Sequence, residues 1–249
     1  MSFRNAWIIT QKEFSIIRLR KTQIYFYIVI PLLLSIGLPL LVWHVINGQS
    51  IRATSIHYIA VSGLMHAFEF FFVIVAVVLS SYTAAYSIVG EKIQKSLEPL
   101  LSTPISDGEI ILGKALSAFI PSYLAVILGN SIYMTLMDKV TYHLLGYSYY
   151  PTLGTIIVLL LLVPVSIILS IEISTMSSSR VTDPRSAYQL SMIGFIPFFI
   201  VYILTEISVI TLTSTTLLII SVIVAAADVA MYPLVIRTFS RERILTSWK

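Results

Sequence analysis

Residues 70–89 read FFFVIVAVVLSSYTAAYSIV, twenty consecutive positions without a charged side chain. At a rise of about 1.5 Å per residue, a helix of this length crosses the roughly 30 Å hydrocarbon layer of a membrane. The stretch lacks the strict alternation of apolar and polar residues that marks a strand of a membrane barrel. It therefore predicts a transmembrane helix, and it belongs to a longer apolar run at Ile59–Val89.

Five further runs have the length and composition of spanning helices. The six predicted spans are Ile24–Ile46, Ile59–Val89, Leu116–Met137, Leu153–Met176, Tyr188–Leu204 and Thr213–Ile236. The second is long enough to project beyond the lipid, and the fifth is short and contains Pro197. The sequence thus predicts an all-α integral membrane protein with about six transmembrane helices in a single domain, residues 1–249.

The overall composition supports this fold class. Hydrophobic residues make up 57% of the chain and charged residues only 11%, whereas a soluble domain is about 45–50% apolar and about 25% charged. The chain has no cysteine, which excludes disulfides and thiolate metal sites.

The basic residues predict the orientation. Fourteen of the sixteen Lys and Arg residues fall before the first span, in the second or fourth connection, or after the last span, while Arg52 and Lys139 fall on the other side. The positive-inside rule places the fourteen in the cytoplasm. We therefore expect a multi-pass protein of the cell membrane with both termini cytoplasmic, a basic tail at 237–249, and no nucleic-acid partner.

Residues 1–21 resemble a helix that lies in the membrane interface. Phe3, Trp7, Phe14 and Ile17 recur near one face at helical spacing, and the basic residues lie elsewhere. Such an amphipathic helix rests in the headgroup layer. A membrane anchor is the simpler interpretation, and docking of a cytosolic partner is the alternative.

The second connection, residues 90–114, carries an apolar stripe. Ile93, Leu97, Leu100 and Leu101 follow the i, i+4, i+7, i+8 spacing of one helix face. Pro99 favours a helix that restarts at that point. An ordinary solvated loop has no need of such a stripe, so we predict a short surface helix here.

Stop and start signals follow the stripe. Pro104 ends the predicted surface helix, and Ser106 with Glu109 forms a capping box that begins the third span.

Residues 108–114 also match the first seven positions of a phosphate-binding loop. Ala115 replaces the Ser or Thr that would hold magnesium, and no strand precedes the stretch, so nucleotide binding is rejected. Gly113 is instead expected to permit close helix packing.

The fourth connection, residues 177–186, is a second turn on the predicted cytoplasmic side. Asp183 is suited to the N-cap of the next helix, with Pro184 at its first position. This turn begins the fifth span, and it is also a candidate for contact with the same partner as the second connection.

These features together resemble the permease subunit of type-2 ABC exporters. The resemblance lies in Glu91, in the segment LEPLLSTPIS at 97–106, in ILGK at 111–114, and in SSRVTDPR at 178–185. The amphipathic N-terminal helix and the six-span layout match as well. Two differences are IQK at 93–95, where the family often has a charged pair and a glycine, and the short connection 206–216.

The resemblance implies a partner and a mechanism. Two permease subunits pair, identical or homologous, and each binds a separate ATPase subunit that carries the ATP and Mg²⁺, so this chain binds no cofactor and catalyses no reaction. The coupling region is 90–114, whose helix sits in a groove of the ATPase, a contact that needs an apolar stripe. The implied contact residues are Glu91, Leu97, Glu98, Leu100, Leu101, Thr103 and Pro104, with Arg180, Asp183 and Arg185 in the second cytoplasmic loop.

Three acids, Glu69, Glu172 and Asp228, fall within spans two, four and six. Charged groups in lipid cost several kcal/mol, so these are candidates for the translocation pathway. One interpretation is that they are protonated, hydrogen-bonded to Tyr, Ser or Thr side chains, or face an aqueous cavity. The alternative is that they bind a cationic substrate or ion.

Two other classes of function, a stand-alone carrier or channel and a membrane enzyme, are the alternatives. A stand-alone carrier or channel could use the three acids as an ion relay, but a carrier should contain two related halves, and none is visible. A membrane enzyme needs a nucleophile and a base at matched depth, and the histidines fall toward the outer side. His66 and Glu69 are one turn apart, yet no ligand-spacing motif supports a metal site. Tyr147, Tyr149 and Tyr150 suit an aromatic belt.

Overall fold

The computed structural model of the chain describes residues 3–48, 55–93, 105–181, 183–207 and 209–238. Every element in these ranges is a helix. In chain order they are α1 (Phe3–Leu19), α2 (Lys21–Gly48), α3 (Ser55–Ile93), α5 (Asp107–Leu145), α6 (Leu153–Ile157), η1 (Val158–Leu162), α7 (Val163–Arg180), α8 (Pro184–Ser191), η2 (Met192–Phe195), α9 (Ile196–Glu206) and α10 (Ser214–Thr238).

Six helical segments among the described residues are long and apolar enough to cross a membrane, which confirms the predicted span count. They are Lys21–His44, Gly63–Ile93, Asp107–His143, Leu153–Ser179, Arg185–Glu206 and Ser214–Thr238. The third extends well beyond the predicted Leu116–Met137, because polar and charged residues at both ends continue the same helix. Between α9 and α10, the described residues 207 and 209–213 form no helix.

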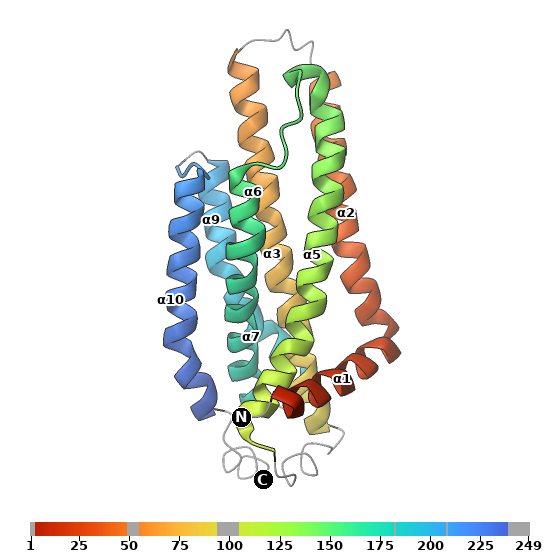
Figure 1. Cartoon of the computed structure of the whole chain (residues 1–249), viewed down its shortest axis with the longest axis vertical. Coiled ribbons are helices and arrows are strands. Elements are labelled where there is room, and N and C mark those ends of the chain that lie inside the picture. The colour runs from red at the N-terminus through yellow and green to blue at the C-terminus, as the bar shows by residue number, and fades with distance from the viewer. Residues whose placement is uncertain (1–2, 49–54, 94–104, 182, 208, 239–249) are drawn as a thin grey trace.

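The bundle has two distinct ends (Figure 1). We call the end with α1, the start of α5 and the end of α10 the basal end, and the opposite end the distal end. At the distal end α3 and α5 extend past α6, α9 and α10, as expected for helices of 39 residues each. The second and third spans thus both extend past these neighbouring helices at the distal end.

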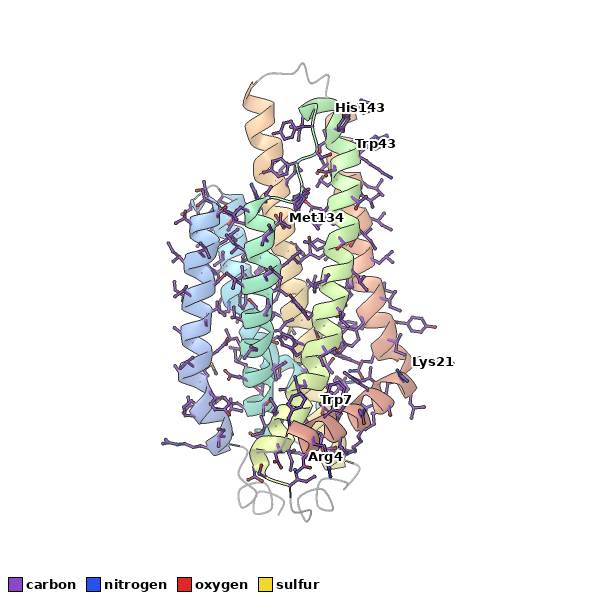
Figure 2. All side chains as sticks on the ribbon, viewed as in Figure 1. Arg4, Trp7, Lys21, Trp43, Met134 and His143 are labelled. Carbon is purple, nitrogen blue, oxygen red and sulfur yellow. The ribbon has the colours of Figure 1, made fainter. Side chains whose placement is uncertain are left out.

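The short helix α1 lies across the basal end (Figure 1). Arg4, Trp7 and Lys21 lie toward this end, whereas Trp43 and His143 lie at the distal end (Figure 2). Trp at both ends of a bundle is typical of the two membrane interfaces.

The buried face of helix α1 is not the aromatic face that the sequence predicted. Its buried face is formed by Ala6, Ile9, Thr10 and Glu13. The predicted aromatic stripe is a separate face, with Phe3 exposed and stacked on Trp7 at a centroid distance of 6.5 Å. The helix is thus both amphipathic, as expected, and docked on the bundle.

Helix α3 is the core of the bundle, and it packs closely on α7 through serines. Ser80 Oγ lies 2.7 Å from Ser170 Oγ, and Ser170 Oγ donates to the carbonyl of Val77 at 3.1 Å. Ser174 Oγ donates to the carbonyl of Ser81. Small hydroxyl residues let membrane helices approach closely and hydrogen-bond across the interface.

The fourth span contains one π-helical turn, η1. Pro164 follows it and has no N–H to donate to a carbonyl of the preceding turn, which explains why the regular bonding pattern is interrupted. Tyr123 of α5 donates its hydroxyl to the carbonyl of Leu159 inside this turn, at 3.2 Å. A backbone acceptor that lies at membrane depth is thereby satisfied.

Candidate coupling site and membrane cavity

Four charged side chains join α1, α3 and α5 at the basal end. Lys114 Nζ lies 2.7 Å from Glu91 Oε2 and 3.1 Å from Glu13 Oε1, and Lys12 Nζ lies 2.5 Å from Glu91 Oε1. Lys114 also donates to the hydroxyl and the carbonyl of Ser87. We call Lys12, Glu13, Glu91 and Lys114 the basal charge cluster. Its two positive and two negative groups balance, and all but Lys12 are buried.

A close backbone contact lies beside this cluster. A Cβ added at Gly113 would come within 2.7 Å of both the Ala6 carbonyl oxygen and the Ile9 Cβ. Thr10 donates its hydroxyl to the Gly113 carbonyl at 3.0 Å. Only glycine permits this approach, which bears out the packing role expected for Gly113 and shows that its partner is α1.

The start of α5 has the predicted capping box. The backbone N–H of Glu109 donates to Ser106 Oγ, and the backbone N–H of Ser106 donates to Glu109 Oε2 at 3.1 Å. Asn5 of α1 donates to the same carboxylate at 3.3 Å. The residues that end the second connection are therefore fixed to α1 as well as to α5.

Lys92, at the end of α3, links the start of the second connection to the start of the fourth connection. Its ammonium group donates to the carbonyls of Ser178, Ser179 and Val181, at 2.6, 2.9 and 3.3 Å. These carbonyls are at the end of α7, where a helix has unpaired acceptors and the negative end of its dipole. The last turn of α3 is thus tied to the start of the connection between α7 and α8.

The second loop begins α8 as predicted. Asp183 is the N-cap and accepts from the backbone N–H of Ser186 at 3.0 Å, with Pro184 at the first helical position. This hydrogen bond holds the pKa of Asp183 below its usual range. Ala187 of α8 packs against Ala85 and Val89 of α3. Arg185 is exposed beside them.

The predicted coupling residues thus have different positions. Glu91 is buried in the basal charge cluster, so its side chain is not exposed for contact with a partner. Arg180 ends α7 and Asp183 caps α8. The others, Leu97, Glu98, Leu100, Leu101, Thr103 and Pro104, lie outside the described residues, as does the basic tail from residue 239.

The phosphate-loop-like stretch is helical. Residues 108–114 lie within the first turns of α5, and Lys114 is paired with two carboxylates. A phosphate-binding loop needs a non-helical glycine-rich turn with a free lysine. The geometry agrees with the rejection of nucleotide binding at this stretch.

A cavity of about 430 Å³ lies between α5, α7 and α10. Its walls are apolar, with Leu112, Ala115 and Phe119 from α5 and Ile168 from α7, and Glu172 also lines it. Glu172 is 8% exposed, and its Oε2 has no hydrogen-bond partner in the described structure. Asp228 of α10 is equally buried, has an unpartnered Oδ1, and lies near enough to Glu172 to interact electrostatically.

Glu69 belongs to a different group nearer the distal end. His66 Nδ1 lies 3.9 Å from Glu69 Oε2, and Tyr149 hydrogen-bonds to His66 Nε2 at 2.7 Å. Tyr150 is buried and donates to the carbonyl of Met65. Of the three tyrosines proposed for an aromatic belt, Tyr150 is buried, Tyr149 is partly buried and packs against the core, and Tyr147 is exposed.

The three membrane acids do not form one site. Ser80 and Ser170 mark the same level on α3 and α7. Glu69 is eleven residues on the distal side of Ser80, and Glu172 is two residues on the basal side of Ser170. At 1.5 Å per residue the two acids are about 20 Å apart along the bundle. No group of three potential metal ligands occurs in the part of the chain that the structure describes.

Comparison with known proteins identifies the class. A family model described as ABC-2 family transporter protein matches residues 46–220, well over half of the chain. The chain belongs to this family, and it is a multi-pass permease of an ABC transporter. The search of curated proteins found no match.

Sequence reasoning missed several residues of this region. In the sequence, Lys12, Lys92 and Lys114 count only among the basic residues that predict the orientation, apart from the place of Lys114 in the motif at 111–114, and no role is predicted for Glu13. One sequence feature could have indicated this cluster: acidic and basic residues occur in nearly equal numbers in α1, at the end of α3 and at the start of α5. Sequence does not say which of these charges face one another.

Proposed function

We propose that this chain is the permease subunit of an exporter that is driven by ATP hydrolysis on a separate subunit. ATP and Mg²⁺ bind on that ATPase, and two permeases, identical or homologous, pair to form the translocation pathway. The segment 91–106 transmits the motion of the ATPase to the bundle. The family membership makes the chain a permease, and the arrangement of the basal end supports the coupling role.

The observation that carries this proposal is the fixation of both ends of the second connection. At one end Glu91 and Lys92 bind α1, α5 and the end of α7. At the other end Ser106 and Glu109 are fixed by the capping box and by Asn5. A force applied between these ends therefore reaches four helices through short, buried polar contacts, which resist stretching more than side chains in water do.

The charge distribution supports a cytoplasmic location for the basal end. The basic residues of α1, the end of α3, the start of α5 and the end of α10 all lie there, and Lys139 lies near the distal end of α5. An excess of Lys and Arg marks the cytoplasmic side of a membrane protein. An ATPase in the cytoplasm would then meet the second and fourth connections together.

Disruption of the apolar stripe tests the coupling role. The tagged chain is purified from membranes of its own host, and the ATPase activity that accompanies it is measured. We expect the pair Leu97→Asp and Leu101→Asp to reduce this activity at least tenfold, because both charges fall on the predicted contact face. Ser102→Asp, which introduces the same charge off the stripe, should retain it. Equal activity in all three proteins would contradict the coupling role.

Reconstitution separates the exporter from a stand-alone carrier. In liposomes the chain without its ATPase should not move any substrate against a gradient, whereas the complex with ATP should. Uphill transport by the chain alone would contradict the proposal and would favour the carrier.

A further inference from the structure

The cavity between α5, α7 and α10 has the properties of a ligand site. Its volume of about 430 Å³ falls within the roughly 300–1,000 Å³ of pockets that hold small organic molecules. Apolar side chains make up nearly all of its surface, and a single carboxyl group, that of Glu172, interrupts them. Pockets of this kind bind the body of a ligand by apolar contact and orient it through one or a few polar groups.

One oxygen of the carboxyl group in the wall has no hydrogen-bond partner among the described residues. Glu172 is more than nine-tenths buried, and its Oε2 makes no hydrogen bond within the described residues. None of the side chains that line the cavity is basic. A buried carboxyl group without a partner is costly, so its presence calls for a compensating group. A cationic ligand bound against this partly open, apolar wall supplies such a group.

A second acid makes the site more negative. Asp228 lies across the α7–α10 interface, is also more than nine-tenths buried, and has an unpartnered Oδ1. Two nearby carboxyl groups oppose an anionic ligand and attract a cationic one. Tyr232, one turn further along α10, lines the same cavity and offers an aromatic face to a cation.

We propose that this cavity binds a hydrophobic organic cation, with Glu172 as its counter-ion and Asp228 as a second negative group. This inference rests on the proposed function in one respect, since it names the substrate class of the transport pathway. Glu172 lies eight residues before the end of α7, about 12 Å from the basal end. A ligand in the cavity therefore occupies the basal half of the bundle, where it arrives from the side on which the ATPase binds.

Binding of tetraphenylphosphonium to the purified full-length chain in detergent micelles tests the inference. This probe combines one positive charge with an apolar body. We expect saturable binding to the wild type by equilibrium dialysis, and at least tenfold weaker binding to Glu172→Gln. Asp228→Asn should weaken binding by a smaller factor. Tetraphenylborate, similar in shape and opposite in charge, should not compete.

Two further variants keep the test decisive. Ala115→Phe fills the cavity from α5 without a change of charge, and it should abolish binding. Glu69→Gln removes an acid about 20 Å away and should bind as the wild type does. Binding that is unchanged in Glu172→Gln, equally lost in Glu69→Gln, or equally strong for tetraphenylborate would overturn the inference and would indicate a cavity occupied by lipid chains. Because no ATPase is needed, failure here leaves the co-purification result unaffected.

Discussion

Buried acids occur both in the basal charge cluster and at the membrane cavity, but they are paired with lysines only in the cluster. In the cluster, Glu91 and Glu13 each meet a lysine at hydrogen-bonding distance. Glu172 in the cavity wall and Asp228 near it each have an oxygen without a hydrogen-bond partner among the described residues, and no basic side chain of the described residues lines the cavity. A paired acid fixes neighbouring helices, whereas an unpaired acid in an apolar wall is suited to a ligand that brings the missing charge.

The difference also separates the two tasks of a transporter. The cluster joins α1, α3 and α5 beside the connection that we propose to receive force from the ATPase. The cavity lies between α5, α7 and α10, and α10 packs on α7 at the border of the bundle. The same helix, α5, takes part in both. Its Lys114 belongs to the cluster and its Ala115 lines the cavity, so movement of its first turns would reach both sites at once.

Removal of Lys114 should give the largest effect on stability. Lys114→Met leaves Glu13 and Glu91 buried without the ammonium group that they share, and loss of one partner from a buried ion pair costs about 3–5 kcal/mol. The measurement is the free energy of unfolding of the purified chain in mixed micelles. Lys114→Arg keeps the charge and should lose much less. A loss below about 1 kcal/mol in Lys114→Met would show that the cluster does not hold the helices together.

An added methyl group at Gly113 should give an intermediate effect. Gly113→Ala forces α1 away from α5, because the new Cβ would clash with the Ala6 carbonyl and the Ile9 side chain. Overpacking of this kind costs about 1–3 kcal/mol. Gly63→Ala is the matched control, since nothing lies within 4 Å of a Cβ there; it should be neutral or stabilising by about 0.5–1 kcal/mol. Faster proteolysis of α1 in Gly113→Ala alone would locate the damage, and equal stability of both variants would argue against the close contact.

The smallest effect on stability is expected for Glu172→Gln. This change removes an acid whose Oε2 has no hydrogen-bond partner among the described residues, so the free energy of unfolding should stay near the wild-type value or rise. The same variant is expected to lose ligand binding, which gives a clear contrast with Lys114→Met. A loss of several kcal/mol would mean that Glu172 stabilises the bundle, and the contrast between the two regions would fail.

Much of the fold follows from local sequence. The spans were predicted because a run of about twenty apolar residues has few alternatives in a membrane, and the starts of α5 and α8 because Ser106, Glu109 and Asp183 satisfy backbone donors within their own turns. The length of α5 was underestimated. Hydropathy marks where lipid ends, but the helix continues through polar residues to Leu145.

The sequence by itself determined the number of spans and the caps that begin two of the helices, because each depends on interactions within about one turn or on transfer between water and lipid. Only the tertiary structure decided that Glu91 is paired with Lys12 and Lys114, that Gly113 faces α1, and that Glu172 lies apart from Glu69. These facts depend on which faces of distant helices meet. The sequence alone does not show whether a carboxylate faces a lysine of another helix or the apolar wall of a cavity.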